Sequence, residues 1–271
     1  MAIKLILTDI DGTILPYGKK AVSERCVAAF RAARAAGILV GPASGRFYSW
    51  IPGFFGGDAT CCETALATNG SQVYLGGELV LQKEVPAEGI RRAMEALAGV
   101  GRSGLLFFEG ATPYLVQGDR EDLRECFPSY AETCLDRDDV PDAGITKANV
   151  FVCGDMARTR ETVAMLNREV PGIDFDVPQA AFSNAMPAGW NKGEAVKWLM
   201  GRLGISPDEA VVFGDAGNDL QMFGAVEHSV AVAGALPEAR DAARWHIGAV
   251  EDDAVPAAIE ALAAGDWPFT A

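Results

Sequence analysis

Ile3-Lys4-Leu5-Ile6-Leu7-Thr8-Asp9-Ile10-Asp11-Gly12-Thr13 is the stretch that decides the fold. Its apolar first half is typical of a parallel strand that is buried on both faces. The strand then stops at Asp9 and Asp11, which point to the same face and need a cation or a bound proton to relieve their repulsion. Ligands of open α/β sheets bind beyond the carboxyl ends of strands, so the pair predicts a site there. The plainer alternative is a solvated acidic turn, because Asp-Gly is a common turn pair.

The same design occurs again near the other end of the chain. Ala210-Val211-Val212-Phe213 predicts a second buried strand, and it runs directly into Gly214-Asp215-Ala216-Gly217-Asn218-Asp219. An acidic cluster after a second parallel strand suits a hard divalent cation that prefers oxygen ligands.

Composition limits the classes of protein that the chain can belong to. The 271 residues are 49% hydrophobic and 22% charged, which is typical of a globular protein. A formal net charge of -14 argues against general nucleic-acid binding and against docking on an anionic membrane. An anionic substrate is still compatible with this charge, because a local cation and a divalent metal can reverse the potential inside one cleft.

Neither a membrane span nor a structural zinc site is expected. No stretch of about eighteen uninterrupted apolar residues occurs, and Lys4 and Asp9 interrupt the N-terminal apolar run too early for a signal peptide. A cytoplasmic protein is therefore expected. The six cysteines show no C-x-x-C spacing, which argues against zinc; they are Cys26, Cys61, Cys62, Cys126, Cys134 and Cys153.

Two further loops follow predicted strands. Residues 38–40 predict a strand that Gly41-Pro42 breaks, and it leads to Ser44-Gly45-Arg46, where a hydroxyl and backbone N–H groups can bind an oxyanion. An ordinary turn is the alternative for this tripeptide. Residues 66–70 predict another strand that ends in Thr68-Asn69-Gly70, and a hairpin with a Gly-Gly turn is expected over residues 73–81.

A lysine stands at a helix start. Asn191 can cap this helix and Glu194 can reach back, which predicts a capping box and a helix that continues through Leu203. Lys192 then lies in the first turn, where a cation opposes the helix dipole and needs a compensating anion. A solvated surface lysine is the alternative.

The middle of the chain has an α/β rhythm of its own. The pattern predicts helices over residues 87–98, 120–127 and 158–170, and strands over residues 105–109, 114–117, 148–153, 175–177 and 182–185. Because the earlier βα pattern resumes afterwards, we expect an inserted domain at residues 84–187 and a core made of residues 1–83 and 188–271. The G-x-G-x-x-G match at residues 99–104 follows a helix and precedes a strand, so it predicts a plain loop.

Taken together, four motifs resemble those of the haloacid dehalogenase-like hydrolase superfamily. They are Asp9-x-Asp11-Gly12-Thr13, Ser44-Gly45-Arg46, Lys192-Gly193 and Gly214-Asp215-x-x-Asn218-Asp219. The large insertion and Thr68-Asn69-Gly70 look like the Cof-type branch with a class IIB cap. The resemblance covers essentially the whole chain and implies a Rossmann-like parallel-sheet core with an inserted α/β cap. Pro42 is a mild departure, since the family usually carries a non-proline residue there.

This resemblance also implies a chemistry. Asp9 would form an aspartyl-phosphate, and Asp11 would protonate the leaving group and then deprotonate water. Mg²⁺ would be held by the Asp9 carboxylate, the Asp11 carbonyl and Asp215, with Asp219 beside them. Lys192 and Ser44 would bind the non-bridging oxygens. The remaining roles are that Asn218 and Asp219 orient Lys192 or metal-bound water, and that the substrate side includes Gly45, Arg46, Asn69, Gly70 and Asn218.

A magnesium-dependent phosphatase that acts on a small phosphate ester is therefore expected, and the family favours a sugar phosphate. One alternative is a phosphomutase, which would need convergent cations in the cap for a second phosphate; Lys147 is the only cation beside a predicted cap strand. The other is a non-catalytic phosphometabolite-binding protein. Asn184 is a candidate for substrate contact, and the sequence is compatible with a monomer or a homodimer.

Overall fold

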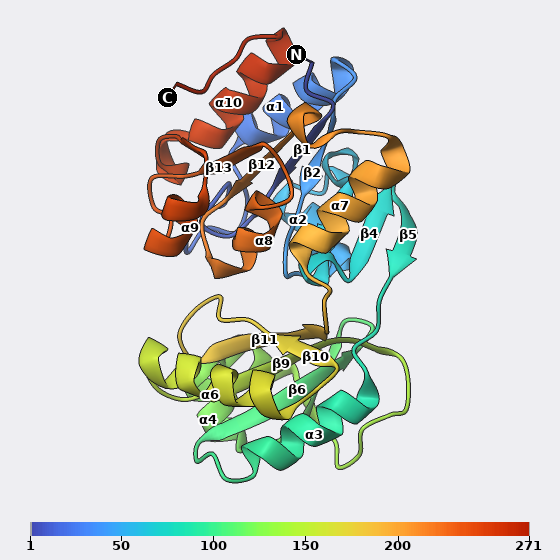
Figure 1. The fold of residues 1–271 in the computed structure, drawn as a ribbon, viewed down its shortest axis with the longest axis vertical. Helices are drawn as coiled ribbons and strands as arrows, with labels where there is room; N and C mark the ends of the chain where they lie inside the picture. The colour runs from blue at the N-terminus through green and yellow to red at the C-terminus, as the bar shows by residue number, and fades with distance from the viewer. Residues whose placement is uncertain (1, 271) are drawn as a thin grey trace. The chain divides into compact units, whose positions relative to one another are not determined.

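A computed structural model describes residues 2–270 and divides the chain into two compact units. The core unit contains the chain up to residue 82 and from residue 191 onward, and the cap unit contains residues 83–190. Figure 1 shows the core in blue, cyan, orange and red and the cap in green and yellow. The predicted α/β fold class, a parallel-sheet core with an inserted α/β unit, is confirmed.

The core unit is built on a five-stranded sheet of parallel strands in the order β14-β13-β12-β1-β2. Its strands are β1 (Leu5–Thr8), β2 (Leu39–Pro42), β12 (Ala210–Gly214), β13 (His228–Ala231) and β14 (Trp245–His246). A three-stranded antiparallel sheet contains β3 (Ala65–Ala67), β4 (Gln72–Leu75) and β5 (Glu78–Gln82). Its helices are α1 (Glu24–Ala35), α2 (Ile51–Phe54), α7 (Lys192–Leu203), α8 (Leu220–Phe223), α9 (Pro237–Ala242) and α10 (Ala254–Ala264).

Helices α1 and α10 lie side by side against one face of this sheet (Figure 1). Alternate strand residues supply the apolar surface that they cover, including Ile6, Val40 and Phe213. Such alternation follows from the two-residue period of side chains along a strand. Helices α7 and α8 pack against each other, and α8 also contacts β12 and β13.

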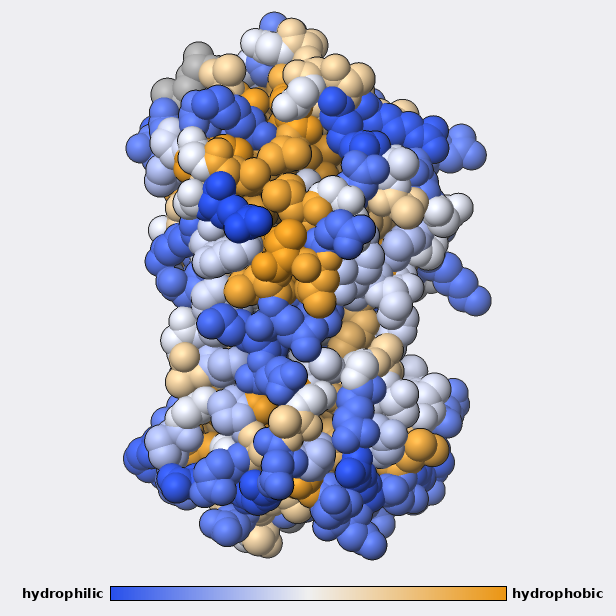
Figure 2. Space-filling model, turned by 90° about the vertical axis from the view of Figure 1, so that its right-hand side faces the viewer, coloured by the Kyte–Doolittle hydropathy of each residue, from blue (hydrophilic) through white to orange (hydrophobic). Residues whose placement is uncertain are grey.

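The sequence predicted that Gly41-Pro42 would end strand β2. The strand instead continues through Pro42, which pairs with Thr8 of β1. A proline is tolerated at the edge of a sheet because its missing N–H removes no ladder hydrogen bond there. The predicted hairpin is confirmed as β4 and β5, and Gly76 and Gly77 both have positive φ, as a primed turn requires. Leu79 of β5 is 45% exposed, and Figure 2 shows hydrophobic residues gathered on this side of the core.

The cap unit contains a six-stranded sheet in the order β10-β11-β9-β6-β7-β8, in which only the β7–β8 pair is parallel. Helices α3 and α6 bury one face of this sheet around Leu105, Phe107 and Val150. Helix α4 contacts β6 and β9, and helix α5 contacts β7. The strands are β6 (Ser103–Glu109), β7 (Thr112–Gln117), β8 (Leu135–Asp136), β9 (Ile145–Val152), β10 (Ile173–Phe175) and β11 (Phe182–Pro187). The helices are α3 (Ala87–Leu97), α4 (Arg120–Cys126), α5 (Pro128–Thr133) and α6 (Met156–Glu169).

The predicted loop at residues 99–104 does connect helix α3 to strand β6, so the glycine pattern there is not a dinucleotide fingerprint. Within residues 2–270 we find no helix that is both long and apolar enough to cross a bilayer.

Candidate active site

The centre of the site is a buried lysine between two carboxylates. Lys192 Nζ lies 2.6 Å from Asp9 Oδ1 and 2.7 Å from Asp219 Oδ1. The side chains of Lys192 and Asp219 are fully buried, and that of Asp9 is 10% exposed. Asp9 follows β1, and its backbone N–H still donates to Phe213 of β12, so the sheet fixes its position. The compensating anion that Lys192 needs at its helix start is therefore supplied by two aspartates.

Asp215 completes an acidic group at this edge of the sheet. One oxygen each from Asp9, Asp215 and Asp219 can be chosen so that all three lie within 4.8 Å of one another. Asp219 Oδ2 accepts from the backbone N–H of Asp215 at 3.0 Å and of Ala216 at 3.1 Å, which holds the loop closed around it. The donor set consists of oxygen alone, and this is the chemistry that Mg²⁺ prefers. Three of the four predicted metal residues are thus brought together.

The ionisation of this group is strongly perturbed. Burial raises the pKa of Asp9 well above its usual range, against the opposing charge of Lys192. Burial, with the neighbouring Asp219 charge, raises the pKa of Asp215 to about 7. Burial alone would lower the pKa of Lys192, but the carboxylates of Asp219 and Asp9 outweigh it, so the pKa of Lys192 is raised and the ammonium persists. The site therefore holds more negative charge than one lysine balances, which favours binding of a cation or a proton.

The side chain of the fourth predicted metal residue, Asp11, is paired with an arginine. Arg46 binds it in a bidentate pair, with Nε 2.8 Å from Asp11 Oδ2 and Nη2 2.7 Å from Asp11 Oδ1. The Asp11 side chain is 38% exposed, so it lies at the rim of the site. The guanidinium of Arg46 also stacks over the ring of Phe54. The Asp11 carboxylate is therefore occupied by Arg46, and the role of the Asp11 backbone carbonyl at the metal stays a prediction.

The two predicted loops after the strands lie against each other. The backbone N–H of Thr68 donates to Arg46, and that of Asn69 donates to Ser44. Ser44 is buried, and its hydroxyl accepts from the Arg46 backbone N–H at 3.2 Å. Asn69 Oδ1 accepts from Asn218 Nδ2 at 3.3 Å, while its own Nδ2 is buried without a partner among residues 2–270. This buried donor can therefore give a hydrogen bond to a bound acceptor.

Backbone strain marks the loop around Asn69. Thr68, Asn69 and Gly70 all have positive φ, at 49°, 55° and 88°. A left-handed threonine is unfavourable because it is β-branched, and such residues persist where the surrounding structure fixes them, often at functional sites. Gly70 is needed for close packing as well, because a Cβ there would lie 2.6 Å from the Ala195 Cβ of α7. The loop is thus held against the same helix that carries Lys192.

Glycines of the predicted motifs allow close approach at two more positions. A Cβ on Gly193 would lie 2.2 Å from the backbone oxygen of Gln221, so this glycine lets α7 and α8 pack together. A Cβ on Gly214 would lie 2.6 Å from the Asp219 carboxyl carbon. Both glycines therefore keep the surroundings of Lys192 and Asp219 compact.

Two residues near Asp215 received no role from the sequence. Thr13 Oγ1 donates to Asp215 Oδ1 at 2.8 Å, and the Tyr17 hydroxyl donates to Asp215 Oδ2 at 3.4 Å. Both bonds favour the charged carboxylate and oppose the rise in its pKa. The only signal for Thr13 was its place in the first motif, and nothing marked Tyr17, which is 75% exposed.

In the cap, Asn184 lies in a buried amide network. Its Nδ2 donates to both carboxylate oxygens of Asp176 at 3.0 Å, and its Oδ1 accepts from Asn149 Nδ2 at 3.0 Å. Next to Asn149 on β9, buried Lys147 donates to the Tyr130 hydroxyl of α5 at 3.3 Å. The cap sheet therefore carries a polar cluster of Lys147, Asn149, Asn184, Asp176 and Tyr130.

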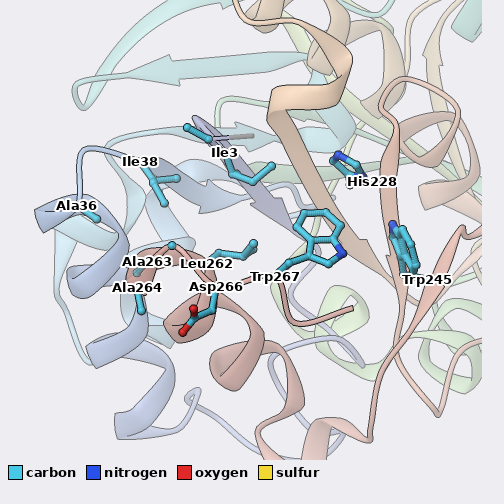
Figure 3. Close-up of a pocket in the computed structure, with 12 residues that line it drawn as sticks. Ile3, Ala36, Ile38, His228, Trp245, Leu262, Ala263, Ala264, Asp266 and Trp267 are labelled. Atoms are coloured by element: carbon cyan, nitrogen blue, oxygen red, sulfur yellow. The ribbon is translucent and has the colours of Figure 1, made fainter. Parts of the chain in front are cut away.

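A cavity of about 660 Å³ lies in the core but is not this site. Ile3 and Ile38, which precede β1 and β2, line it together with His228 and Trp245, which begin β13 and β14 (Figure 3). These residues mark the amino ends of parallel strands, whereas Asp9 and Asp215 follow carboxyl ends. The cavity is therefore at the opposite edge of the sheet from the aspartates.

Comparison with known proteins gives the family. A profile of the haloacid dehalogenase-like hydrolases matches residues 6–259. The putative phosphatase YkrA of Bacillus subtilis strain 168 is 25% identical over 259 residues, covering 96% of this chain and 97% of that protein. YbjI of Escherichia coli K12, named a 5-amino-6-(5-phospho-D-ribitylamino)uracil phosphatase, is 25% identical and covers 99% of both chains.

Among solved structures, the subclass IIB sugar phosphatase BT4131 has the same fold, with a TM-score of 0.81 and 19% identity over 95% of this chain and 98% of that chain. This assignment rests on three observations that agree: the four motifs, their convergence in the core, and the family profile that spans nearly the whole chain. The chain belongs to the haloacid dehalogenase-like hydrolases, in their Cof-type branch.

Proposed function

We propose that the protein is a magnesium-dependent phosphatase that hydrolyses a small phosphorylated metabolite through an aspartyl-phosphate on Asp9. The observation that carries the proposal is the buried contact of Lys192 with Asp9 and Asp219, next to Asp215. A nucleophilic carboxylate needs a positively charged setting before it can approach an anionic phosphoryl group. Relatives that are named phosphatases, YkrA and YbjI among them, support the same reaction class.

The residues present fit a magnesium ion, because three buried carboxylates offer oxygen ligands within 4.8 Å of one another. The carboxylates of Asp9 and Asp215 and the backbone carbonyl of Asp11 would hold it, with Asp219 beside them. When bound, it would neutralise charge on the nucleophile and on the phosphoryl oxygens. Thr13 and Tyr17 favour the ionised form of Asp215 that this role requires, since both donate to its oxygens.

The reaction divides into two displacements. In the first, an Asp9 carboxylate oxygen bonds to phosphorus while the ester P–O bond breaks, and the leaving alkoxide takes a proton from Asp11. In the second, water bonds to phosphorus, the P–O bond to Asp9 breaks, and Asp11 takes a proton from the water. Lys192 stays charged throughout and stabilises the negative charge shared by Asp9 and the phosphoryl oxygens.

Asp11 must change partner to do this work. In the structure both of its oxygens accept from the Arg46 guanidinium, which occupies the positions where Asp11 would carry or receive a proton. Proton transfer to a leaving group therefore requires that Asp11 separate from Arg46. The partial exposure of both side chains leaves room for this change, and the arginine can then bind the substrate phosphate, a role that its family position implies.

For the substrate we favour a sugar phosphate, or another phosphate ester rich in hydroxyl groups. BT4131 is named a sugar phosphatase, and YbjI is named for a phosphoribitylamino compound, both of which agree with this class. Because Asn184 is already bonded to Asp176 and Asn149, we assign it a positioning role within the cluster.

The test is phosphate release from an aryl phosphate and from a panel of sugar phosphates, with magnesium and with a chelator. We expect release that depends on the metal and is abolished in Asp9→Asn, with one phosphoryl group per chain trapped on the wild type after rapid acid quenching. Release that survives in Asp9→Asn would contradict the nucleophile assignment. Activity that appears only with a sugar bisphosphate activator would favour the phosphomutase, and binding without turnover would favour a non-catalytic phosphometabolite-binding protein.

A further inference from the structure

Two free thiols of the cap unit lie in direct contact. Cys126 is the last residue of α4, Cys153 directly follows β9, and their Sγ atoms are 2.8 Å apart. A disulfide bond is about 2.05 Å long, so the sulfurs need to approach by less than about 1 Å. Neither residue belongs to the proposed catalytic site, which lies in the core unit.

Both cysteines are held by the elements around them. The Cys153 backbone N–H donates to the Arg102 carbonyl at 2.9 Å, which extends the register of β9 onto the turn before β6. The Cys153 thiol also contacts the Asp122 carbonyl of α4 at 3.2 Å. Helix α4 itself packs on β6 and β9. The short distance between the two sulfur atoms therefore results from the packing of helix α4 against strand β9.

We propose that Cys126 and Cys153 are a modification site, at which a small disulfide of the glutathione class converts the two thiols into a reversible intramolecular disulfide. The Cys126 thiolate attacks one sulfur of the small disulfide, forming a mixed disulfide and releasing one thiolate. The Cys153 thiolate then attacks Cys126 Sγ and displaces the second small thiolate. Two cysteine protons end on the two released thiols, and the two electrons lost by the cysteines reduce the small disulfide.

Exposure decides the order of attack. Cys126 is partly exposed, whereas Cys153 is only 2% exposed, so an oxidant reaches Cys126 first. Burial and the hydrogen bond with Cys153 raise the pKa of Cys126 to about 12. The charged groups beside it are Glu125, which adds to the rise, and Arg102, which opposes it and is itself paired with Glu125 and Asp122. The thiolate is thus scarce at neutral pH, and the exchange should accelerate up to about tenfold for each pH unit between 7 and 9.

The bond would tie the end of α4 to β9, the strand that carries Lys147 and Asn149. Phe127 follows Cys126 at once and begins the turn into α5, whose Tyr130 accepts a hydrogen bond from Lys147. Oxidation would therefore fasten the α4–α5 segment onto the face of the cap sheet that holds the polar cluster. We expect the cap to unfold at a higher temperature in the oxidised protein than in the reduced one.

The whole protein is incubated with oxidised glutathione at pH 8.5, then unfolded and alkylated. Before alkylation we expect a mass lower by two hydrogen atoms. After alkylation we expect two fewer alkylated cysteines and a linked peptide that contains Cys126 and Cys153, both reversed by prior treatment with dithiothreitol. The matched control is Cys134→Ser, which removes another buried cap cysteine and should leave the cross-link intact.

Two variants keep the test decisive. In Cys126→Ser all remaining thiols should stay alkylatable after oxidation. In Cys153→Ser the reaction should end at the mixed disulfide between Cys126 and glutathione. The proposal is overturned if all six cysteines of the folded wild type stay alkylatable after oxidation. It is equally overturned if the two missing labels map to other cysteines.

Discussion

Replacing Lys192 by methionine tests the electrostatic balance of the site most directly. The change keeps an unbranched stem as far as Cε but removes the ammonium that lies 2.6 Å from Asp9 Oδ1 and 2.7 Å from Asp219 Oδ1. Removing one partner of a buried ion pair leaves an uncompensated charge and costs about 3–5 kcal/mol. At roughly 2–4 °C for each kcal/mol in a domain of this size, the melting temperature of the core should fall by about 6–20 °C.

The loss should depend on pH and on magnesium. Burial already raises the pKa values of Asp9 and Asp215 above those of the unfolded chain, and without the lysine they rise further. A carboxyl group whose pKa is raised by folding contributes stability at low pH, and that contribution is lost as the pH rises through its folded pKa. The destabilisation should therefore be largest near pH 8 and smaller near pH 5. Saturating magnesium should recover part of it, because a cation again faces the carboxylates.

Urea unfolding followed by tryptophan fluorescence measures the effect, since four of the five tryptophans lie in the core unit. The matched control is Lys197→Met on the same helix, where the side chain is 54% exposed and pairs with Glu194. An exposed pair of this kind contributes about 0–1 kcal/mol. The reasoning is refuted if, at pH 8 without magnesium, the free energy of unfolding of Lys192→Met lies within about 1 kcal/mol of that of Lys197→Met. Buried charges would then not balance the site in the way proposed.

Three further predictions concern Asp215 and its neighbours. Because the pKa of Asp215 is raised to about 7 without metal, the affinity for magnesium should fall as the pH is lowered from 7 to 5, by up to about tenfold per pH unit for each carboxyl group that takes up a proton. Calorimetric titration at several pH values checks this, and a flat profile contradicts it. Thr13→Val removes the 2.8 Å hydrogen bond to Asp215, so magnesium affinity should drop at pH 7 and recover at pH 9, whereas an equal loss at both values would point to damaged packing. Gly12→Ala places a Cβ 2.5 Å from Asp215 Oδ2 at a φ of 81°, and its phosphatase rate should collapse. Its control, Gly57→Ala, has a φ of 86° and open space around the new Cβ, so it should cost only about 1–2 kcal/mol of stability and leave the rate unchanged.

The strands and the family were predictable because the signals are local. Each buried parallel strand is a short apolar run that ends at a polar or glycine-rich motif, as Leu5–Thr8 and Ala210–Gly214 show. The meeting of Asp9 with Asp215 then follows from topology, since β1 and β12 are parallel neighbours whose carboxyl ends share one edge.

Other features depend on tertiary context that a local pattern does not contain. Strand β14 has only two residues and exists because Trp245 pairs with Val230, a contact that no local pattern around Trp245 indicates. Helix α5 was missed because Pro128 resembles a stop, although proline is favourable in the first turn of a helix. The pairing of Asp11 with Arg46 joins side chains from two loops, and no spacing rule predicts which carboxylate an arginine selects.

The position of β1 in the middle of the core sheet has a consequence for synthesis on the ribosome. One edge of β1 can pair with β2 early, but its other partner, β12, emerges only after the entire cap and α7 have been made. At about 5–20 residues per second, this leaves the N–H and C=O groups along that edge without their partner strand for roughly 10–40 s. The cap, by contrast, is one continuous segment and can fold before β12 has been synthesised to pair with β1. An open, apolar strand edge is a template for pairing with other chains, so nascent protein that stalls within the cap should depend on chaperones that cover Leu5–Thr8.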